Sequence, residues 1–421
     1  MNLRSISWKS YHQGVCNLFE NLIGQDSIKK QLNTGIQQAR LPHSLLFSGE
    51  DYSGKMTAAL ELARAISCNT ENAPWDCNCR SCRDHRVMNN PDLLLLGRRY
   101  FLEEIKASAE LLNRSRANFS VYMFIRNVRK LLKRFEPVIW EGQEKKLSKY
   151  SGTLSSVSEL LEQLDPEKEL MEENALKKYL DDITNQIRTL IPAVPATTPI
   201  DQIRNISKWA HRTSSGKAKI VIIEKADTLL EGSANSLLKI LEEPPPHVSF
   251  ILITDRKGSI IQTIRSRVRN FEFTPRSADT SRLILEKLFR HEESSLSLNQ
   301  FFQSWSDTDY NFISAHIRLF MDSCFTGASI RDLDDLFLYF DKNKSKEDLK
   351  RFLRLLSDEL RLRYVEDPDL ISTVQGQQLV NEIQIEINKC LSNSQIYNQS
   401  SLFLLESLFY NVREKYEAFC K

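Results

Sequence analysis

The stretch Gly49–Thr57, GEDYSGKMT, limits the fold of this chain more than any other part of its sequence. It follows a short apolar run, SLLFS, and precedes a run with helical character, AALELARAI. Gly49, Gly54 and Lys55 fit the pattern G-x-x-x-x-G-K-[ST], in which backbone amides surround phosphate groups and the lysine contacts the outer phosphates. A strand, a glycine loop and a helix in this order predict a phosphate loop in an α/β fold.

The last position of the pattern is altered. Met56 replaces the serine or threonine whose hydroxyl binds Mg²⁺, and a thioether is a poor ligand for this hard cation. Thr57 points about 100° further around the helix, so we do not expect it to reach the metal. The loop therefore keeps the groups that bind a nucleotide but lacks a usual ligand of its metal ion.

The second nucleotide motif is altered as well. It should be an apolar strand that ends in acidic residues, and KIVIIEKAD supplies Glu224 at the metal-side position. Lys225 stands where a glutamate would polarise the attacking water, and its charge would oppose the metal. Two changes in one mechanism argue against hydrolysis and against Mg²⁺ binding. ATP binding is less damaged, because Lys55 and the loop amides remain.

The remaining pattern predicts an α/β fold with helical additions. Strand and helix runs alternate through KIVIIE, SANSLLKILEE and SFILIT, which indicates a parallel sheet covered on both faces. Residues 98–190 read as a helical insertion, and apolar residues repeat there at spacings of 4 and 3 from Leu176 to Leu190. Beyond about residue 276 the periodicity is helical only.

One helix of the insertion, YMFIRNVRKLLKRF, is strongly basic. Charges on an amphipathic helix usually form a solvated face, and we favour that interpretation over contact with DNA. The basic residues are Arg126, Arg129, Lys130, Lys133 and Arg134.

Four of the eight cysteines are clustered within fifteen residues, and they are Cys68, Cys77, Cys79 and Cys82. Four thiolates suit tetrahedral Zn²⁺, and a site with four protein ligands is structural. His85 is a nearby substitute ligand. Four buried free thiols are the alternative, and disulfides are disfavoured in a reducing compartment.

The composition excludes some classes of protein. The 421 residues contain 57 Lys and Arg against 55 Asp and Glu, and a net charge of +2 does not indicate bulk attraction to nucleic acid. The first residues lack the apolar core of a signal peptide, and no apolar run approaches the roughly 18 residues that span a bilayer. We expect a soluble, cytoplasmic protein with no membrane partner.

Several segments occur together as they do in one known family, and they are FENLIGQDSIKKQL, LPHSLLFSG, the cysteine insert, ANSLLKILEEPPPHVSFILIT and TIRSRV. They resemble the gamma/tau and delta-prime subunits of the bacterial DNA polymerase III clamp loader. The resemblance covers residues 19–96 and 196–275 well and the last third loosely. The block LLKILEEPPPHV, residues 237–248, is its most specific part.

The resemblance implies an α/β P-loop domain of the AAA+ type with a parallel sheet over residues 1–275. This domain contains a zinc module at 68–90 and the helical insertion at about 98–190. A helical lid would follow at 276–342 and a helical collar, through which such subunits oligomerise, at 343–421. The family has two residues between its second and third cysteines where this chain has one, so its loop must be tighter.

The resemblance also implies roles for single residues. Thr254, at the end of SFILIT, resembles a nucleotide sensor. Arg267, in SRV, resembles an arginine finger that reaches the ATP of a neighbouring subunit and stabilises charge on the transferred phosphoryl group. Val268 replaces the cysteine of the family's signature and keeps an apolar side chain.

Degenerate nucleotide motifs with a retained arginine resemble the delta-prime subunit, which would not hydrolyse ATP. Its partners would be the gamma/tau and delta subunits, the sliding clamp and, through the assembly, primed DNA. One alternative is a gamma/tau-type subunit with residual ATPase, in which Thr57 or Glu224 helps to hold the metal. Another is a scaffold outside replication that uses only the fold. The insertion has no counterpart in the resemblance.

Overall fold

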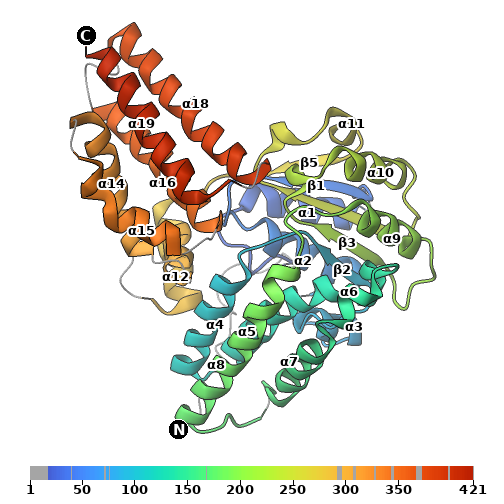
Figure 1. Cartoon of the computed structure of the whole chain (residues 1–421). Coiled ribbons are helices and arrows are strands. Elements are labelled where there is room, and N and C mark those ends of the chain that lie inside the picture. The colour runs from blue at the N-terminus through green and yellow to red at the C-terminus, as the bar shows by residue number, and fades with distance from the viewer. Residues whose placement is uncertain are drawn as a thin grey trace. The chain divides into compact units, whose positions relative to one another are not determined.

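The computed structural model divides into two compact units, Met1–Trp305 and Ser306–Lys421. Each unit has its own apolar core. The structure (Figure 1) describes residues 18–38, 40–70, 73–74, 76–166, 168–291, 296–306, 310–326, 329–342, 346–366, 372–396 and 399–420.

The described strands of the first unit form one five-stranded parallel sheet in the order β2-β3-β4-β1-β5. Ser48, the last residue of β1, lies opposite Thr254 of β4 and Glu272 of β5. The carboxyl ends of the strands therefore share one edge, which is where ligands bind in such sheets. The strands are β1 (Ser44–Ser48), β2 (Leu93–Leu96), β3 (Lys219–Ile223), β4 (Val248–Thr254) and β5 (Arg269–Glu272).

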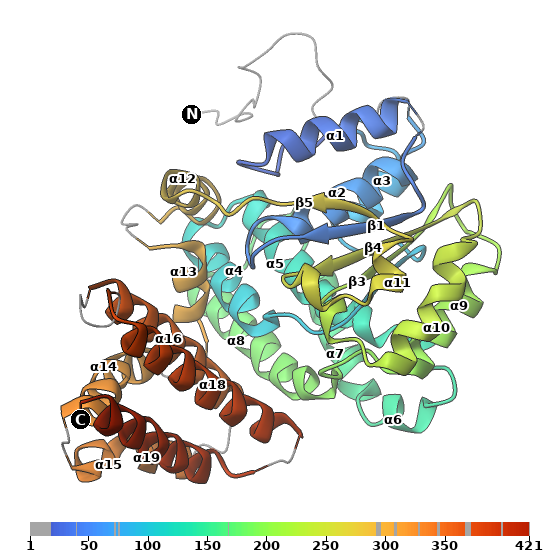
Figure 2. The ribbon, with the colours of Figure 1, turned by 90° about the horizontal axis from the view of Figure 1, so that it is seen from above.

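Strands β1 to β4 are buried on both faces, which explains why they are almost continuously apolar, whereas β5, RNFE, is mostly exposed. Alternate residues point to opposite faces: Leu93 and Leu95 join one core cluster, and Leu94 and Leu96 join the other. Figure 2 shows the helices that form the two layers. They are α1 (Asp26–Gln37), α2 (Lys55–Ser67) and the short α3 (Arg80–Arg86) on one side, with α9 (Ile200–Ala210) and α10 (Glu231–Glu242) on the other.

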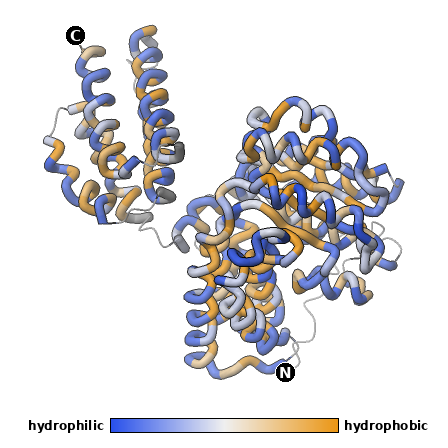
Figure 3. The backbone as a smooth tube through the Cα atoms, turned by 45° about the vertical axis from the view of Figure 1, so that its right-hand side comes forward, coloured by the Kyte–Doolittle hydropathy of each residue, from blue (hydrophilic) through white to orange (hydrophobic). Residues whose placement is uncertain are grey.

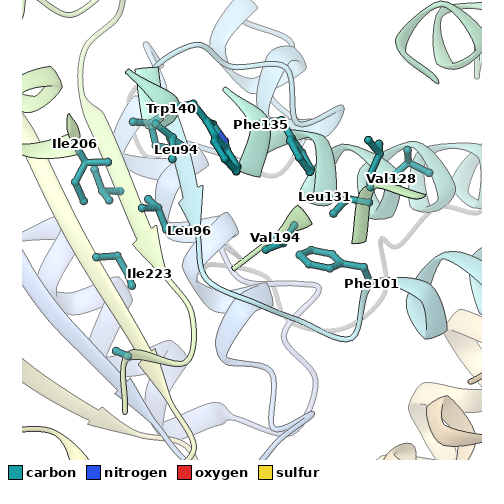
Figure 4. Packing of buried hydrophobic residues seen from close by; sticks show 14 of the residues in the cluster. Leu94, Leu96, Phe101, Val128, Leu131, Phe135, Trp140, Val194, Ile206 and Ile223 are labelled. Atoms are coloured by element: carbon teal, nitrogen blue, oxygen red, sulfur yellow. The ribbon is translucent and has the colours of Figure 1, made fainter. Parts of the chain in front are cut away.

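The insertion is helical, as predicted, and it enlarges one of the two cores. The apolar residues of its predicted seam, such as Leu180 and Ile187, are buried. Phe101, Phe135 and Trp140 pack in the same cluster as the β2 side chains (Figure 4). Its elements are α4 (Phe101–Ser115), α5 (Asn118–Leu132), η1 (Lys133–Phe135), η2 (Pro137–Trp140), α6 (Glu144–Ser148), α7 (Ser151–Gln163), α8 (Glu173–Leu190) and η3 (Ile191–Ala193).

Short elements complete the first unit, and they are η4 (Ala226–Thr228), η5 (Lys257–Ser259), α11 (Gln262–Arg265), α12 (Ala278–Phe289) and α13 (Leu298–Ser304). The side chain of Ser277 caps α12, and Ser297 with Gln300 forms a capping box at α13. These caps define where each helix begins. Both helices share a small apolar cluster with α4 of the insertion.

The regular elements that the structure describes in the second unit are all helices. Its core buries Leu405, Leu408 and Phe409, so the apolar face of the last helix is covered within the unit. Figure 3 shows how apolar and polar residues alternate along these helices. They are α14 (Tyr310–Thr326), η6 (Ile330–Leu333), α15 (Asp334–Lys342), α16 (Lys346–Glu366), α18 (Val374–Ile396) and α19 (Ser401–Phe419).

The predicted fold class, an α/β P-loop domain with a parallel sheet and helical regions after it, is confirmed. The predicted division of the helical part into a lid and a collar stays a prediction. Its border at residue 343 lies outside the described residues, and the two compact units meet at Trp305 and Ser306.

Candidate functional site: a degenerate nucleotide edge and a four-cysteine cluster

The predicted phosphate loop joins β1 to α2 at the carboxyl edge of the sheet. Gly49 and Gly54 have φ angles of 146° and 101°, which side chains rarely adopt. A Cβ on Gly49 would lie 2.4 Å from the carbonyl oxygen of Phe273. No side chain caps the amino end of α2, so its amides can face an anion.

Lys55 is drawn into the loop. It is only 7% exposed, and its Nζ donates hydrogen bonds to the carbonyl oxygens of Gly49 and Glu50. Burial lowers the pKa of Lys55 to about 8, although the carboxylates of Asp51 and Asp255 oppose this shift. The ammonium group of Lys55 is therefore bound by the backbone of the loop itself.

Met56, in contrast, offers nothing to a cation. Its side chain is 5% exposed and belongs to the apolar cluster beneath the sheet. Thr57 follows it and is partly buried. The residue after the lysine thus contributes packing and no metal ligand, because a buried thioether replaces the hydroxyl.

Glu224 directly follows β3, and its carboxylate is bound by two arginines of the insertion. Arg99 Nη1 lies 2.5 Å from Glu224 Oε1, and Arg134 Nη2 pairs with Oε2. Arg99 also donates from Nε to Glu104 Oε2 at 3.0 Å, and Lys130 Nζ lies 3.1 Å from the same oxygen. The acid at the metal-side position therefore belongs to a buried network of two glutamates and three cations.

Ion pairing favours the charged form of Glu104, whereas burial works against the charges of Lys130 and Arg134. Burial alone would raise the pKa of Glu104, but the charges of Arg99 and Lys130 hold it at about 2. Burial lowers the pKa of Lys130 to about 8 and that of Arg134 to about 10. A divalent cation placed beside Glu224 would meet two guanidinium groups, so this edge opposes metal binding.

Lys225 is fixed between two carboxylates. Its Nζ lies 3.0 Å from Asp51 Oδ1 and 3.0 Å from Asp255 Oδ2. Burial would lower the pKa of Lys225, but Asp51, Tyr100 and Asp255 raise it above its ordinary value. The ammonium group is therefore charged, and it cannot accept a proton from water.

Thr254 ends β4 and is fully buried. Its hydroxyl donates to Asp227 Oδ1 at 2.8 Å and accepts from the backbone nitrogen of Arg256 at 2.9 Å. Its carbonyl oxygen accepts from the Gly49 nitrogen at 3.3 Å. The structure thus brings Thr254 to the phosphate loop, with its hydroxyl already engaged.

Arg267 is not part of this cluster of residues at the carboxyl edge of the sheet. It lies in the turn after α11. Its side chain is 33% exposed, and Nε donates to Glu242 Oε1 at 2.7 Å while Nη1 donates to the Thr263 carbonyl at 2.8 Å. The guanidinium group is therefore ordered at the surface by contacts near the end of α10.

The four clustered cysteines come together. All four Sγ atoms lie within 4.8 Å of one another, and the group is Cys68, Cys77, Cys79 and Cys82. Cys68 Sγ is 3.6 Å from Cys77 Sγ and 4.0 Å from Cys79 Sγ. Ligands of tetrahedral zinc, at about 2.3 Å from the metal, are separated by about 3.8 Å, so these thiols fit Zn²⁺. His85 does not belong to the group.

The surroundings of the cluster also suit a metal with four thiolates. The Thr70 hydroxyl, 3.1 Å from Cys77 Sγ, lowers the pKa of Cys77 to about 6, whereas burial raises that of Cys82. Arg64 is buried, and its Nη1 donates to Cys82 Sγ at 3.3 Å. Arg64 is also ion-paired with the buried Glu61, so it would support a bound metal through this hydrogen bond rather than through a free charge.

The expectation of a solvated basic face on α5 is wrong. Arg126 and Arg129 donate to the carbonyl oxygens of Arg86 and Val87 at 3.3 and 2.8 Å. Lys133 is 5% exposed and donates to the Asn90 carbonyl at 2.8 Å. Arg86 and Val87 end α3, where carbonyl oxygens lack helical partners. The basic residues therefore fasten the insertion to the cysteine-rich segment.

Sequence reasoning missed the two arginines on Glu224 and the glutamate beside them. Arg134 is 90 residues away from Glu224 and Arg99 is 125 residues away, and no local pattern reports a pair of this kind. The one available signal was the density of basic residues on a helix that also needed an apolar face.

Fold and site together define an α/β protein of the phosphate-loop class, in which the predicted metal-side residues Glu224 and Lys225 are ion-paired within the chain. Residues 24–147 and 158–277 match the family described as "DNA polymerase III, delta subunit", and this match covers more than half of the chain. The chain belongs to this family.

Individual relatives agree with the assignment. The chain is 25% identical over 256 residues to DNA polymerase III subunit tau of Bacillus subtilis, a match that covers 61% of this chain and 29% of that protein. It is 41% identical over 70 residues to subunit delta' of Haemophilus influenzae, covering 16% of this chain and 21% of that protein. The chain thus spans less than a third of the length of these relatives.

A solved DNA polymerase III gamma subunit-related protein from Thermotoga maritima has a TM-score of 0.38 and 14% identity. That superposition covers 92% of this chain and 99% of the other, and the likeness is too distant to add to the argument. Within the described part of this chain, no helix is both long and apolar enough to cross a membrane.

Proposed function

We propose that this chain is a delta-prime-like, non-hydrolysing subunit of the DNA polymerase III clamp loader. It would help to place the sliding clamp on primed DNA in the cytoplasm, together with gamma/tau and delta subunits. The observation that carries the proposal is the pairing of Glu224 with Arg99 and Arg134. A P-loop enzyme needs an acid at this position for its magnesium ion, and here the acid is neutralised from within.

The other positions of the nucleotide edge support the same proposal. Met56 faces the apolar core, and Lys225 is held by two carboxylates. The positive φ angles of Gly49 and Gly54 and the place of Lys55 within the loop support a remnant of a phosphate loop. The chain would therefore bind a nucleotide weakly or not at all, and it would not turn ATP over.

Arg267 would act on the ATP of a neighbouring subunit. It is one third exposed, and its nearest carboxylate belongs to Glu242, which is itself 47% exposed. A surface ion pair of this kind holds the side chain in place at little energetic cost. The guanidinium group could exchange that carboxylate for the phosphoryl group of a neighbour, as an arginine finger does.

The four-cysteine cluster would hold a structural Zn²⁺. Four protein thiols within 4.8 Å of one another would fill the four coordination positions of the zinc ion and leave none for a substrate. Zinc in this place would join the end of α2 to the segment before β2, because Cys68 caps α2 and the other ligands follow it. Its role would be to fix the fold and not to take part in a reaction.

A gamma/tau-type subunit with residual ATPase is the second candidate. It is favoured by the intact position of Lys55 and by relatives that carry the names tau and gamma. Nothing specific favours a scaffold outside replication.

ATP turnover by the purified chain separates the first two candidates. We expect no phosphate release above the background with MgATP, for the wild type and for Lys55→Ala alike. Magnesium-dependent turnover in the wild type that Lys55→Ala abolishes would replace the proposal with the gamma/tau-type candidate. Clamp loading by an assembly that contains or lacks this chain then tests its place in replication.

A further inference from the structure

We infer that the insertion, through α4, holds the α12–α13 segment against the phosphate loop without the help of a nucleotide. The first observation is an apolar contact. Leu111 on α4 is 2% exposed and shares a cluster with Leu285, Phe289 and Phe302 of the α12–α13 segment. Ala107, one turn earlier on α4, lies in the same cluster.

A polar contact reinforces this attachment at the end of α12. Arg114 Nη2, on the last turn of α4, donates to the carbonyl oxygens of Phe289 at 2.7 Å and Arg290 at 3.1 Å. The last carbonyls of a helix have no partners within that helix. Arg114 satisfies two of them, so the insertion caps α12 from outside.

The phosphate loop itself takes part through Tyr52. Its ring is stacked between Tyr100, which precedes α4, and Phe302 on α13, with centroid separations of 5.8 and 5.0 Å. Tyr52 has a φ of 59°, an uncommon conformation for a bulky residue. The phosphate loop, the insertion and α13 therefore meet in one aromatic stack, to which the loop contributes Tyr52.

The amino end of α4 is tied to the sheet. Glu104, on its first turn, pairs with Arg99 and Lys130, and Arg99 continues to Glu224 at the end of β3. One helix thus connects the carboxyl edge of the sheet with the α12–α13 segment. Both connections consist of side chains of this chain.

With these contacts in place, no nucleotide is needed to hold the α12–α13 segment in position. A ligand shifts a conformational equilibrium only by the difference between its affinities for the two states. The α12–α13 segment already has apolar, aromatic and hydrogen-bonded contacts to the loop side of the sheet. We therefore expect its position to depend on the insertion and to be insensitive to ATP, whether or not the chain hydrolyses ATP.

Hydrogen exchange of the full chain, read by mass spectrometry over residues 278–304, tests this inference. Leu111→Ala removes a buried contact with the segment, and Leu161→Ala removes an equally buried leucine of the insertion, 1% exposed, on α7. We expect exchange over 278–304 to accelerate about tenfold or more in Leu111→Ala. The control should leave it unchanged, and a non-hydrolysable ATP analogue should leave the wild type unchanged.

Arg114→Gln is the second variant, because it removes the capping contact without opening a cavity, and it should accelerate exchange at residues 286–290. Circular dichroism verifies that each variant is folded. Equal exchange over 278–304 in wild type, Leu111→Ala and Arg114→Gln would overturn the inference. So would protection of this segment by the ATP analogue in the wild type, since the nucleotide would then do what we assign to the insertion.

Discussion

The guanidinium group of Arg134 is ion-paired with the carboxylate of Glu224, and the two side chains are 3% and 6% exposed. Arg134 lies in η1, directly after α5 of the insertion, and Glu224 directly follows β3. The insertion thus supplies a fixed cation to the acid that the sequence pattern predicts on the metal side of a phosphate-loop site. The charge at this edge of the sheet is balanced without Mg²⁺.

Replacing Arg134 by methionine should destabilise the first unit by about 3 kcal/mol, because one partner of a buried pair is lost and Glu224 keeps only Arg99. Urea unfolding followed by circular dichroism measures the change. Arg212→Met is the control, since the Arg212–Glu141 pair is 54% and 35% exposed and should contribute at most about 1 kcal/mol. Equal effects of the two substitutions would contradict the role of the buried pair.

The network should also make the chain sensitive to acid. The pKa of Glu104 is about 2 in the folded chain against an ordinary 4.5. A depressed carboxyl pKa stabilises the fold above the unfolded value, and this stability is lost as the pH falls from about 4.5 towards 2. Unfolding free energies across this range should fall by about 3 kcal/mol more in the wild type than in Glu104→Gln.

Glu110→Gln is the matched control for this titration, because Glu110 is an exposed residue of the same helix. It should follow the wild-type pH profile. A Glu104→Gln variant that also follows the wild-type profile would show that the ion pairs with Arg99 and Lys130 do not stabilise the fold.

The purified chain should contain about one zinc ion, measured by elemental analysis after dialysis. Cys82→Ser should lose it, because Cys82 is fully buried among the other three thiols, and chelation should lower the melting temperature of the wild type. Cys420→Ser, at an exposed cysteine far along the chain, should retain the metal. Metal-free wild-type protein with an unchanged melting temperature would favour four free thiols.

Restoring the missing hydroxyl should not restore hydrolysis. In Met56→Thr the loop regains a magnesium ligand, but Glu224 remains bound by Arg99 and Arg134. Calorimetry should therefore find no stronger binding of MgATP than of ATP with a chelator. A magnesium-dependent gain in affinity or turnover would mean that the two arginines yield to the cation.

The sheet and the phosphate loop were predictable because their signals are local. SLLFS, the glycine pattern and AALELARAI follow one another in the chain, and local order alone fixes a strand, a loop and a helix. The four cysteines were predictable for the same reason, as Cys68 and Cys82 are only fourteen positions apart. Folding of one short segment is enough to bring the four thiols together.

The ion pairs of Glu224 and Lys225 were not predictable, since the residues that pair with them come from distant segments. The sequence showed that Lys225 opposes a metal, but not that Asp51 and Asp255 enclose it. Likewise, periodicity placed the basic residues of α5 on a helix without showing what that helix packs against. Lys133 and Arg134 are buried, because backbone carbonyls and a carboxylate of other segments receive their hydrogen bonds.

The most direct test of the account uses the complex that we propose, in which this chain is assembled with gamma/tau and delta subunits, a sliding clamp and primed DNA. ATPase rates are compared for wild type, Arg267→Ala and Arg265→Ala, a neighbouring exposed arginine that serves as control. We predict that Arg267→Ala lowers the rate by about tenfold or more while the complex still assembles, and that Arg265→Ala does not. An unchanged rate in an intact Arg267→Ala complex would contradict the claim that this chain completes a neighbour's active site.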